Sequence, residues 1–384
     1  MTTRVSVAPD LLSWAVERAG WDEETADRRA PHLGAWISGH QPTLKQLEKF
    51  ASDTHTPLGL LFLDVPPVEQ LPIPDMRTIG NAQIGRPSAD LLDTIYLCQD
   101  RQEWYRGNAL AHGHMALEFV GSASTADVPG MVAERIRKLI GFEVKDRAAF
   151  SNWEDALRRL VDKIEQLGVL VMISGIVGSN THRVLHPEEF RGFALSDPIA
   201  PLVFVNGADT KAAQIFTMVH ELAHLFLGES ALSDAAMKAR DGHEAEVWCN
   251  RVAAEVLVPQ ASLRGEYRGE PGTEELARLA ARYRVSSLVV LKQLFAAALI
   301  DWELFQQRYD QELVRIMAKM EERKAQSQGG NYYFTQPLRL SRQFARAVIA
   351  STFEGSTGYR DAYRLLGTKK YETFRNLAAE LGVS

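Results

Sequence analysis

Residues 215–226 read IFTMVHELAHLF, an apolar run that contains His220, Glu221 and His224. If the run is helical, the two histidines project about 40° from each other, so both imidazoles can reach one metal ion. Glu221 then lies where it can take a proton from a water bound to that ion. A buried helix face rarely carries such residues unless they are paired or bind a metal. The stretch therefore favours a HExxH metal site on a helix over 210–226, rather than two histidines satisfied by solvent or core hydrogen bonds.

A catalytic zinc ion needs a third protein ligand and one open position for water. The next predicted helix, residues 244–258, offers Glu246, which shares a face with Asn250 and two alanines. Small side chains allow two helices to approach closely, so the Glu246 carboxylate could reach the metal and Asn250 could orient it. The competing ligands are Glu244, His243, Glu255 and Cys249, of which the last is more typical of a small buried hydrophobe.

The HExxH pattern is similar to that of zinc peptidases, and this resemblance implies peptide hydrolysis. Zinc lowers the pKa of a bound water toward about 7, and Glu221 would accept its proton and pass it to the leaving amine. A strand predicted at 201–205, just before the metal helix, could supply an edge along which an extended peptide pairs. The oxyanion stabiliser is not identified; His182, Tyr332 and Tyr333 are candidates.

Composition places the chain among ordinary globular proteins. Of its 384 residues, 46% are hydrophobic and 24% charged, which excludes a disordered or fibrous protein. Cys98 and Cys249 cannot form a disulfide framework at this size. The start lacks the pattern of a signal peptide, and no apolar run reaches the roughly 18 residues that cross a bilayer. We therefore expect a cytoplasmic protein with no membrane contact.

The periodicity predicts a mostly helical α+β protein with one short sheet and helical flanks that look like helix-turn-helix modules. Its predicted parts are a helix-turn-helix-like domain at 1–75, a metallopeptidase domain at 76–265, a helical extension at 266–327 and a basic helical module at 328–384.

The two flanks differ in charge. Residues 1–75 contain six Lys and Arg against eleven Asp and Glu, whereas residues 331–384 contain eight against four. DNA binding depends on neutralising phosphates, so DNA is possible but not favoured for the acidic N-terminal module. Contact with a protein partner or self-regulation is the preferred interpretation there. The basic C-terminal module could touch nucleic acid or an acidic partner, or be a solvated helical cap.

Two motifs together resemble the ImmA/IrrE group of metallopeptidases. The first is AAQIFT at 212–217 leading into HELAH, and the second is EVWCNRVAA at 246–254 followed by LVP at 257–259. Near the N-terminus, AWISG at 35–39 and QPT at 41–43 are similar to an Xre-type helix-turn-helix domain. The resemblance covers most of residues 10–305.

This resemblance implies a zincin-like, gluzincin-like endopeptidase in which His220, His224 and Glu246 bind zinc and Glu221 is the general base. It also implies cleavage of a repressor or antitoxin protein, and hence regulation of stress, prophage or toxin–antitoxin genes. The alternative is a DNA-binding regulator or toxin–antitoxin component whose metal site is structural or vestigial. The substrate, the cleavage site, the activating signal and the oligomeric state stay open.

Overall fold

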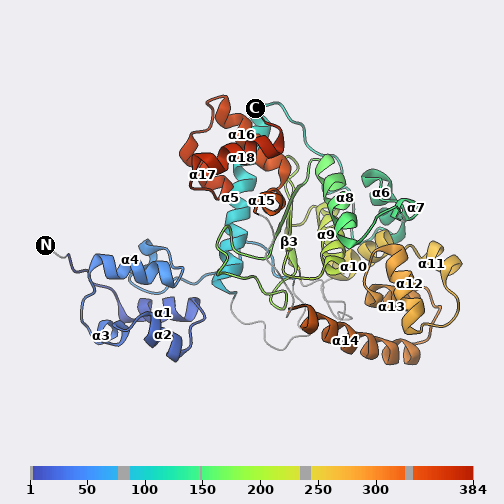
Figure 1. Cartoon of the computed structure of the whole chain (residues 1–384), viewed down its shortest axis with the longest axis horizontal. Helices are drawn as coiled ribbons and strands as arrows, with labels where there is room; N and C mark the ends of the chain where they lie inside the picture. Colours follow the sequence, from blue (N-terminus) through green and yellow to red (C-terminus); the bar gives the residue numbers. More distant parts are fainter. Residues whose placement is uncertain (1–2, 77–86, 148, 234–243, 325–331, 384) are drawn as a thin grey trace. The chain divides into compact units, whose positions relative to one another are not determined.

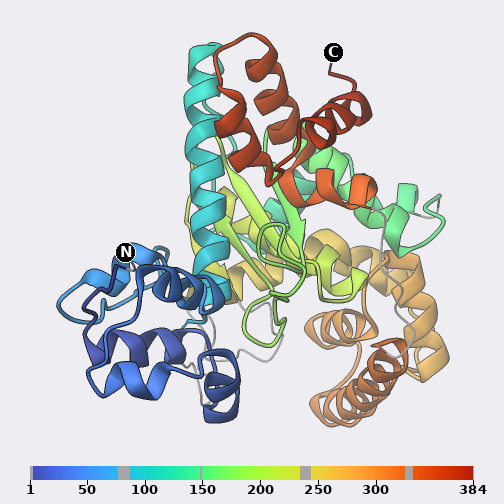
Figure 2. The same cartoon turned by 60° about the vertical axis from the view of Figure 1, so that its left-hand side comes forward.

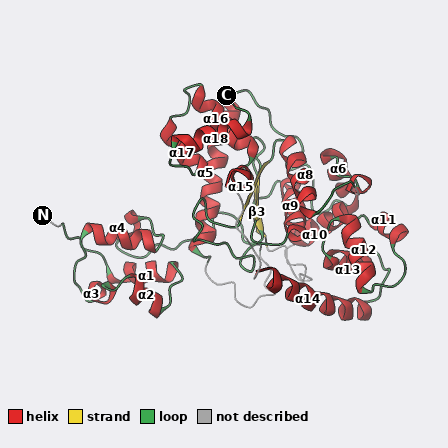
Figure 3. Cartoon of the chain, in the orientation of Figure 1, coloured by secondary structure: helices red, strands yellow, loops and turns green. Residues whose placement is uncertain are grey.

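The computed structural model describes residues 3–76, 87–147, 149–233, 244–324 and 332–383 (Figure 1). The chain forms two compact units. One comprises Met1–Pro72 with Ile84–Ile95, and the other comprises Ile73–Gln83 with Tyr96–Ser384. Among the described residues, helices dominate both units, and one four-stranded sheet lies in the second (Figure 3). The protein is thus a mostly helical α+β structure, as predicted. None of the described helices is both long enough and apolar enough to span a membrane.

The first unit is a group of short helices around a small apolar core. Local signals set their starts: the Asp22 side chain accepts from the amide of Thr25, and Thr43 and Gln46 form a reciprocal capping box. The Trp36 ring packs edge-on against Phe50, with centroids 5.8 Å apart, inside that core. The elements are α1 (Pro9–Arg18), α2 (Glu23–Arg29), α3 (Leu33–Ile37), α4 (Leu44–Asp53) and the 3-10 helix η1 (Leu58–Phe62).

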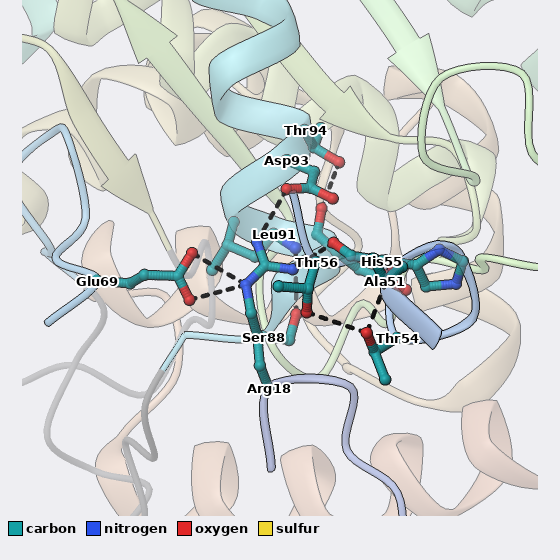
Figure 4. Close-up of polar contacts among 11 residues, drawn as sticks. Arg18, Ala51, Thr54, His55, Thr56, Glu69, Ser88, Leu91, Asp93 and Thr94 are labelled. Carbon is teal, nitrogen blue, oxygen red and sulfur yellow. Dashed lines mark hydrogen bonds and ion pairs between the residues drawn. The ribbon is translucent and has the colours of Figure 1, made fainter. Parts of the chain in front are cut away.

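Arg18, at the end of α1, is a buried cation whose hydrogen bonds are all made within this unit (Figure 4). Its Nε donates to both carboxylate oxygens of Glu69, at 3.0 and 2.8 Å. Its Nη1 donates to the carbonyl of His55 at 2.7 Å, and its Nη2 to Asp93 Oδ1 at 3.1 Å. Asp93 lies in the first turns of α5 (Ala89–Ala111). The guanidinium therefore ties three separate segments of the unit together.

The second unit is built on a mixed sheet with strand order β1-β3-β2-β4. β1 runs parallel to β3, and β2 is antiparallel to both β3 and β4. Every strand residue is buried, as expected for a sheet covered on both faces. The strands are β1 (Leu170–Ser174), β2 (Gly192–Leu195), β3 (Leu202–Asn206) and β4 (Ala231–Ser233).

Helices cover the two faces of this sheet (Figure 1). Val171 of β1 joins the core formed with α8 (Trp153–Gln166) and α9 (Lys211–Leu227). Its neighbour Met172 points the other way, and its Sδ lies 3.9 Å from Cys98 Sγ of α5. The sequence alternation of side chains thus places the metal-motif helix on one face and α5 on the other.

One predicted role of a strand is wrong. We expected residues 201–205 to supply a free edge for a peptide, but β3 is paired on both sides, by β1 and by β2. Strand order depends on long-range pairing, which an apolar pentapeptide does not specify. Of the two outer strands, β4 is the one that lies next to the metal-motif helix, because Ser233 contacts His224.

The remaining helices surround this core, and the C-terminal group packs beside α5 (Figure 2). Trp104 of α5 meets Phe344 edge-on at 5.7 Å, and Arg101 donates to the carbonyl of Leu365. These helices are α6 (Pro129–Ile140), α7 (Val144–Arg147), α10 (Glu244–Leu257), α11 (Gln260–Glu266), α12 (Thr273–Tyr283), α13 (Ser287–Ala296), α14 (Trp302–Lys324), α15 (Tyr332–Leu340), α16 (Arg342–Phe353), α17 (Tyr359–Leu366) and α18 (Tyr371–Leu381).

Candidate metal centre

Helix α9 carries the HExxH residues and has well-defined ends. The Thr210 hydroxyl accepts from the amide of Ala213 at its start, and Gly228 closes it in the left-handed conformation with φ of 76°. Residues 214–226 are all buried, since the sheet lies on one side and α10 packs on another. The side chains of His220, Glu221 and His224 therefore point into the protein interior rather than into solvent.

Helix α10 brings Glu246 to the two histidines. Glu246 Oε2 lies 3.2 Å from His220 Nε2, and Glu246 Oε1 lies 3.0 Å from His224 Nε2. The two Nε2 atoms are themselves 3.2 Å apart. Each of the three residues has 0% exposure and offers one ligand atom to a common point. The structure thus brings together the three residues predicted to bind metal, from two helices, with Glu246 more than 20 positions beyond His224 in the sequence.

Ser233, at the end of β4, is a fourth contributor that sequence reasoning missed. Its hydroxyl lies 3.1 Å from Glu246 Oε1, 3.3 Å from His224 Nε2 and 3.4 Å from Glu221 Oε2. Ser233 is completely buried. The three-residue strand that carries it has no periodicity from which its neighbours could be inferred, so only the sheet pairing reveals its position.

Gly192 of β2 makes room for Glu221. A Cβ at this position would lie 2.6 Å from Thr217 Cγ2, 2.8 Å from the Phe204 carbonyl and 3.0 Å from Glu221 Oε1. Any larger residue would push α9 from the sheet or displace the Glu221 carboxylate. The glycine is required by close packing here, and nothing in the local sequence indicates that.

Burial and mutual charge set the protonation of the group. Burial, with a further contribution from the nearby Glu246 carboxylate, raises the pKa of Glu221 well above its usual value. Burial also lowers the pKa of His224 and so favours a neutral imidazole. Burial opposes ionisation of Glu246, but His220 and His224 outweigh it and lower its pKa. A neutral imidazole, as at His224, and an ionised carboxylate, as at Glu246, are the forms of these groups that bind a metal.

Several polar atoms of this cluster have no hydrogen-bond partner among the described residues. They include Nδ1 of His220 and His224 and Oε1 of Glu221. Among the residues that the structure describes, no Lys or Arg forms an ion pair with the carboxylate of Glu221 or of Glu246. Buried carboxylates need a compensating cation, so the donor set fits a divalent metal ion.

Among the described residues, none of the competing ligands joins the group formed by His220, His224 and Glu246. Glu244 is exposed at the start of α10, and Glu255 accepts hydrogen bonds from the Gln260 amide and from the Gln293 side chain. Cys249 is buried, and that burial raises the pKa of its thiol. His243 falls outside the described residues.

Other residues singled out from the sequence are not gathered at the cluster. Asn250 Oδ1 has no partner among the described residues, and the side chain lines a pocket of about 570 Å³ between α10, α13 and α14. It therefore does not orient Glu246 through that oxygen. His182 is exposed in a loop, and the side chains of Tyr332 and Tyr333 lie outside the described part of the structure.

A buried HExxH helix whose third ligand is a carboxylate from the next helix defines a metallopeptidase-type centre. The family comparison agrees: residues 164–295 match the IrrE N-terminal-like domain, a peptidase family, over about a third of the chain. This part of the chain is therefore a metallopeptidase domain of that family. Residues 340–380 match a domain of unknown function, DUF8813. Among curated proteins, none matches the sequence significantly.

Proposed function

We propose that this protein is a zinc-dependent endopeptidase that acts in the cytoplasm on a partner transcription repressor or antitoxin. The observation that carries the proposal is the convergence of His220, His224 and Glu246 within a domain of a peptidase family, with Glu221 beside them. The substrate class comes from the resemblance of the two helix motifs to the ImmA/IrrE group. The acidic balance of residues 1–75 supports a protein rather than DNA as the partner of the first unit.

The spacing of the ligand atoms supports zinc as the metal. Zinc–nitrogen and zinc–oxygen bonds of about 2.0–2.1 Å in a tetrahedron place neighbouring ligand atoms about 3.3 Å apart. In the cluster the two histidine Nε2 atoms are 3.2 Å apart, which is close to that spacing. Each of them also meets a different oxygen of the Glu246 carboxylate, at 3.2 Å for His220 and 3.0 Å for His224. Two imidazoles and one carboxylate are also the ligand set of many catalytic zinc sites, which keep a position free for water.

The residues of the cluster then have separate roles in the proposed reaction. When bound, zinc supplies Lewis-acid activation of water and of the scissile carbonyl. Glu221 would take the proton from the water and later pass it to the leaving amine. The Ser233 hydroxyl lies between the two carboxylates and can donate its proton to Glu246 Oε1 or to Glu221 Oε2. The apolar walls of α9 and α10 exclude bulk water.

Replacing the proposed base tests this function. Glu221→Gln keeps the shape of the side chain but cannot take a proton, so cleavage of the repressor or antitoxin encoded beside this gene should fall by about 10²- to 10⁴-fold. Zinc content, measured by metal analysis, should stay at the wild-type level. Glu244→Gln, on the exposed start of α10, is the matched control and should cleave normally. Cleavage that persists both in Glu221→Gln and with a chelator would end the catalytic assignment.

A second candidate function is a DNA-binding regulator or toxin–antitoxin component with a structural metal site. The side chains of His220, Glu221, His224 and Glu246 are all completely buried. This burial favours the second candidate, because a catalytic centre has to admit its substrate. If this reading holds, removing zinc lowers the melting temperature while no protein partner is cut. A salt-dependent gel shift on the gene's own promoter would support it, and absence of binding at low salt would remove it.

A further inference from the structure

The outer edge of β4 is already paired with another segment of the chain. The Leu232 amide donates to the Pro74 carbonyl at 3.0 Å, and the Met76 amide donates to the Leu232 carbonyl at 3.0 Å. Asp75 thereby forms a parallel bridge with Leu232. We name residues Ile73–Met76 the strap. Ile73 anchors it with 7% exposure, while Pro74 stays exposed.

This edge borders the metal centre. The carbonyl that receives the Met76 hydrogen bond belongs to Leu232, the residue directly before Ser233. Ser233 in turn contacts Glu221, His224 and Glu246. β1, at the other edge of the sheet, makes none of the described contacts with this group. An extended chain on the outer side of β4 therefore runs beside the metal ligands.

Outer strands are the places where proteins accept an extended peptide, because their amide and carbonyl groups are otherwise unpaired. In this sheet, both outward backbone groups of Leu232 are taken by the strap. A peptide that pairs with β4 has to displace the strap first. Displacing the strap breaks at least the two backbone hydrogen bonds to Leu232 and exposes the Ile73 side chain.

We propose that the strap is an autoinhibitory strand that occupies the position where the cleaved segment of the substrate pairs with β4. This rests on the proposed peptidase function. The substrate segment is then an extended stretch with an apolar residue in place of Ile73, and with a carbonyl and an amide two residues apart to pair with Leu232. The peptidase is thus latent while the strap is docked, and release of the strap makes β4 available.

A matched pair of substitutions at Met76 tests the strap. Met76→Pro removes the amide that donates to Leu232, whereas Met76→Ala removes the side chain and keeps that amide. In the zinc-loaded full chain, hydrogen exchange at the Leu232 amide should be about tenfold faster in Met76→Pro than in wild type. The Met76→Ala variant should stay near wild type, and the Phe204 amide inside the sheet serves as the internal reference.

The same proteins are then compared for cleavage of β-casein, an unfolded protein that offers extended segments. Met76→Pro should cleave it about tenfold faster than wild type and Met76→Ala. Ile73→Ser, which weakens the anchor without touching the backbone, should lie between them, so the outcome does not depend on the folding of one variant. A synthetic peptide of residues 70–76 should slow Met76→Pro and restore protection of Leu232, and a scrambled peptide should do neither.

The outcomes separate the two proposals. If wild type, Met76→Pro and Ile73→Ser cleave equally fast, the peptidase function stands and the strap proposal is overturned. Unchanged exchange at Leu232 in both strap variants overturns it as well. If no variant cleaves any protein although zinc is bound and Leu232 exchanges rapidly in Met76→Pro, the proposed function itself fails.

Discussion

Two groups of buried charges, one in each unit, illustrate how differently a protein can use such groups. Around Arg18, one guanidinium meets two carboxylates and a carbonyl, and each of its nitrogens has an acceptor (Figure 4). At the metal centre, Glu221 and Glu246 lie near two imidazoles, with several polar atoms unpartnered among the described residues. The first group is complete by itself, and the second is complete only with a cation.

The difference shows how a structural ion pair can be told from a metal site without an ion in view. Burial alone does not distinguish them, since the Arg18 side chain is only 3% exposed and the metal-centre residues are not exposed at all. The distinguishing feature is where the lone pairs point. Around Arg18 they point at N–H donors, whereas at the metal centre they point at one another.

The largest effect is expected from removing a ligand of the metal centre. Glu246→Gln replaces the anionic ligand by a neutral one, so zinc content should fall from about one ion per chain to the background of the assay. Because that carboxylate is buried without a cation in the metal-free protein, the metal-free variant should unfold at the same urea concentration as metal-free wild type or a higher one. A variant that keeps its zinc would contradict the assignment of Glu246.

Around Arg18, by contrast, removing one charged side chain should destabilise the protein. Arg18→Met should lower the free energy of unfolding of the first unit by about 3 kcal/mol, because Glu69 and Asp93 lose their partner. Urea unfolding followed by tryptophan fluorescence measures it, and zinc should not change the result. Arg28→Met, which breaks an exposed pair with Glu24 at 4.0 Å, is the control and should change stability by less than about 0.5 kcal/mol.

A smaller effect is expected at Ser233, which touches the metal group without being a predicted ligand. Ser233→Ala should lower the zinc affinity, the cleavage rate or both by about 10- to 100-fold. The reason is that the substitution removes the hydroxyl that contacts the Glu221 and Glu246 carboxylates. Ser230→Ala is the control, because its hydroxyl accepts from the Ser196 amide and not from the cluster. Equal zinc affinity and activity in both variants would show that Ser233 only fills space.

Local sequence patterns were enough for the helices of the centre. The HExxH spacing, the Thr210 start and the Gly228 end predict α9 to within a residue or two, and Glu246 stands out on the helix that follows. Side chains three or four residues apart on one helix meet whatever the rest of the fold does. This explains why His220 and His224 could be paired from the sequence alone.

The contributions from the sheet could not be anticipated. β2 and β4 have four and three residues, too few for a periodic signal, and the interior place of β3 depends on which strands come to lie beside it. Gly192, Ser233 and the strap at Ile73–Met76 become relevant only through those pairings.

The amino-acid sequence by itself determined the chemical inventory of the centre and the helices that carry it, because helix geometry is fixed by neighbours within one turn. Only the tertiary structure decided which strand borders the metal group, which glycine and serine adjoin Glu221, and which segment lies on the outer edge of the sheet. Those contacts join residues separated by from about a dozen to more than 150 positions, and chain folding in three dimensions, rather than local propensity, brings them together.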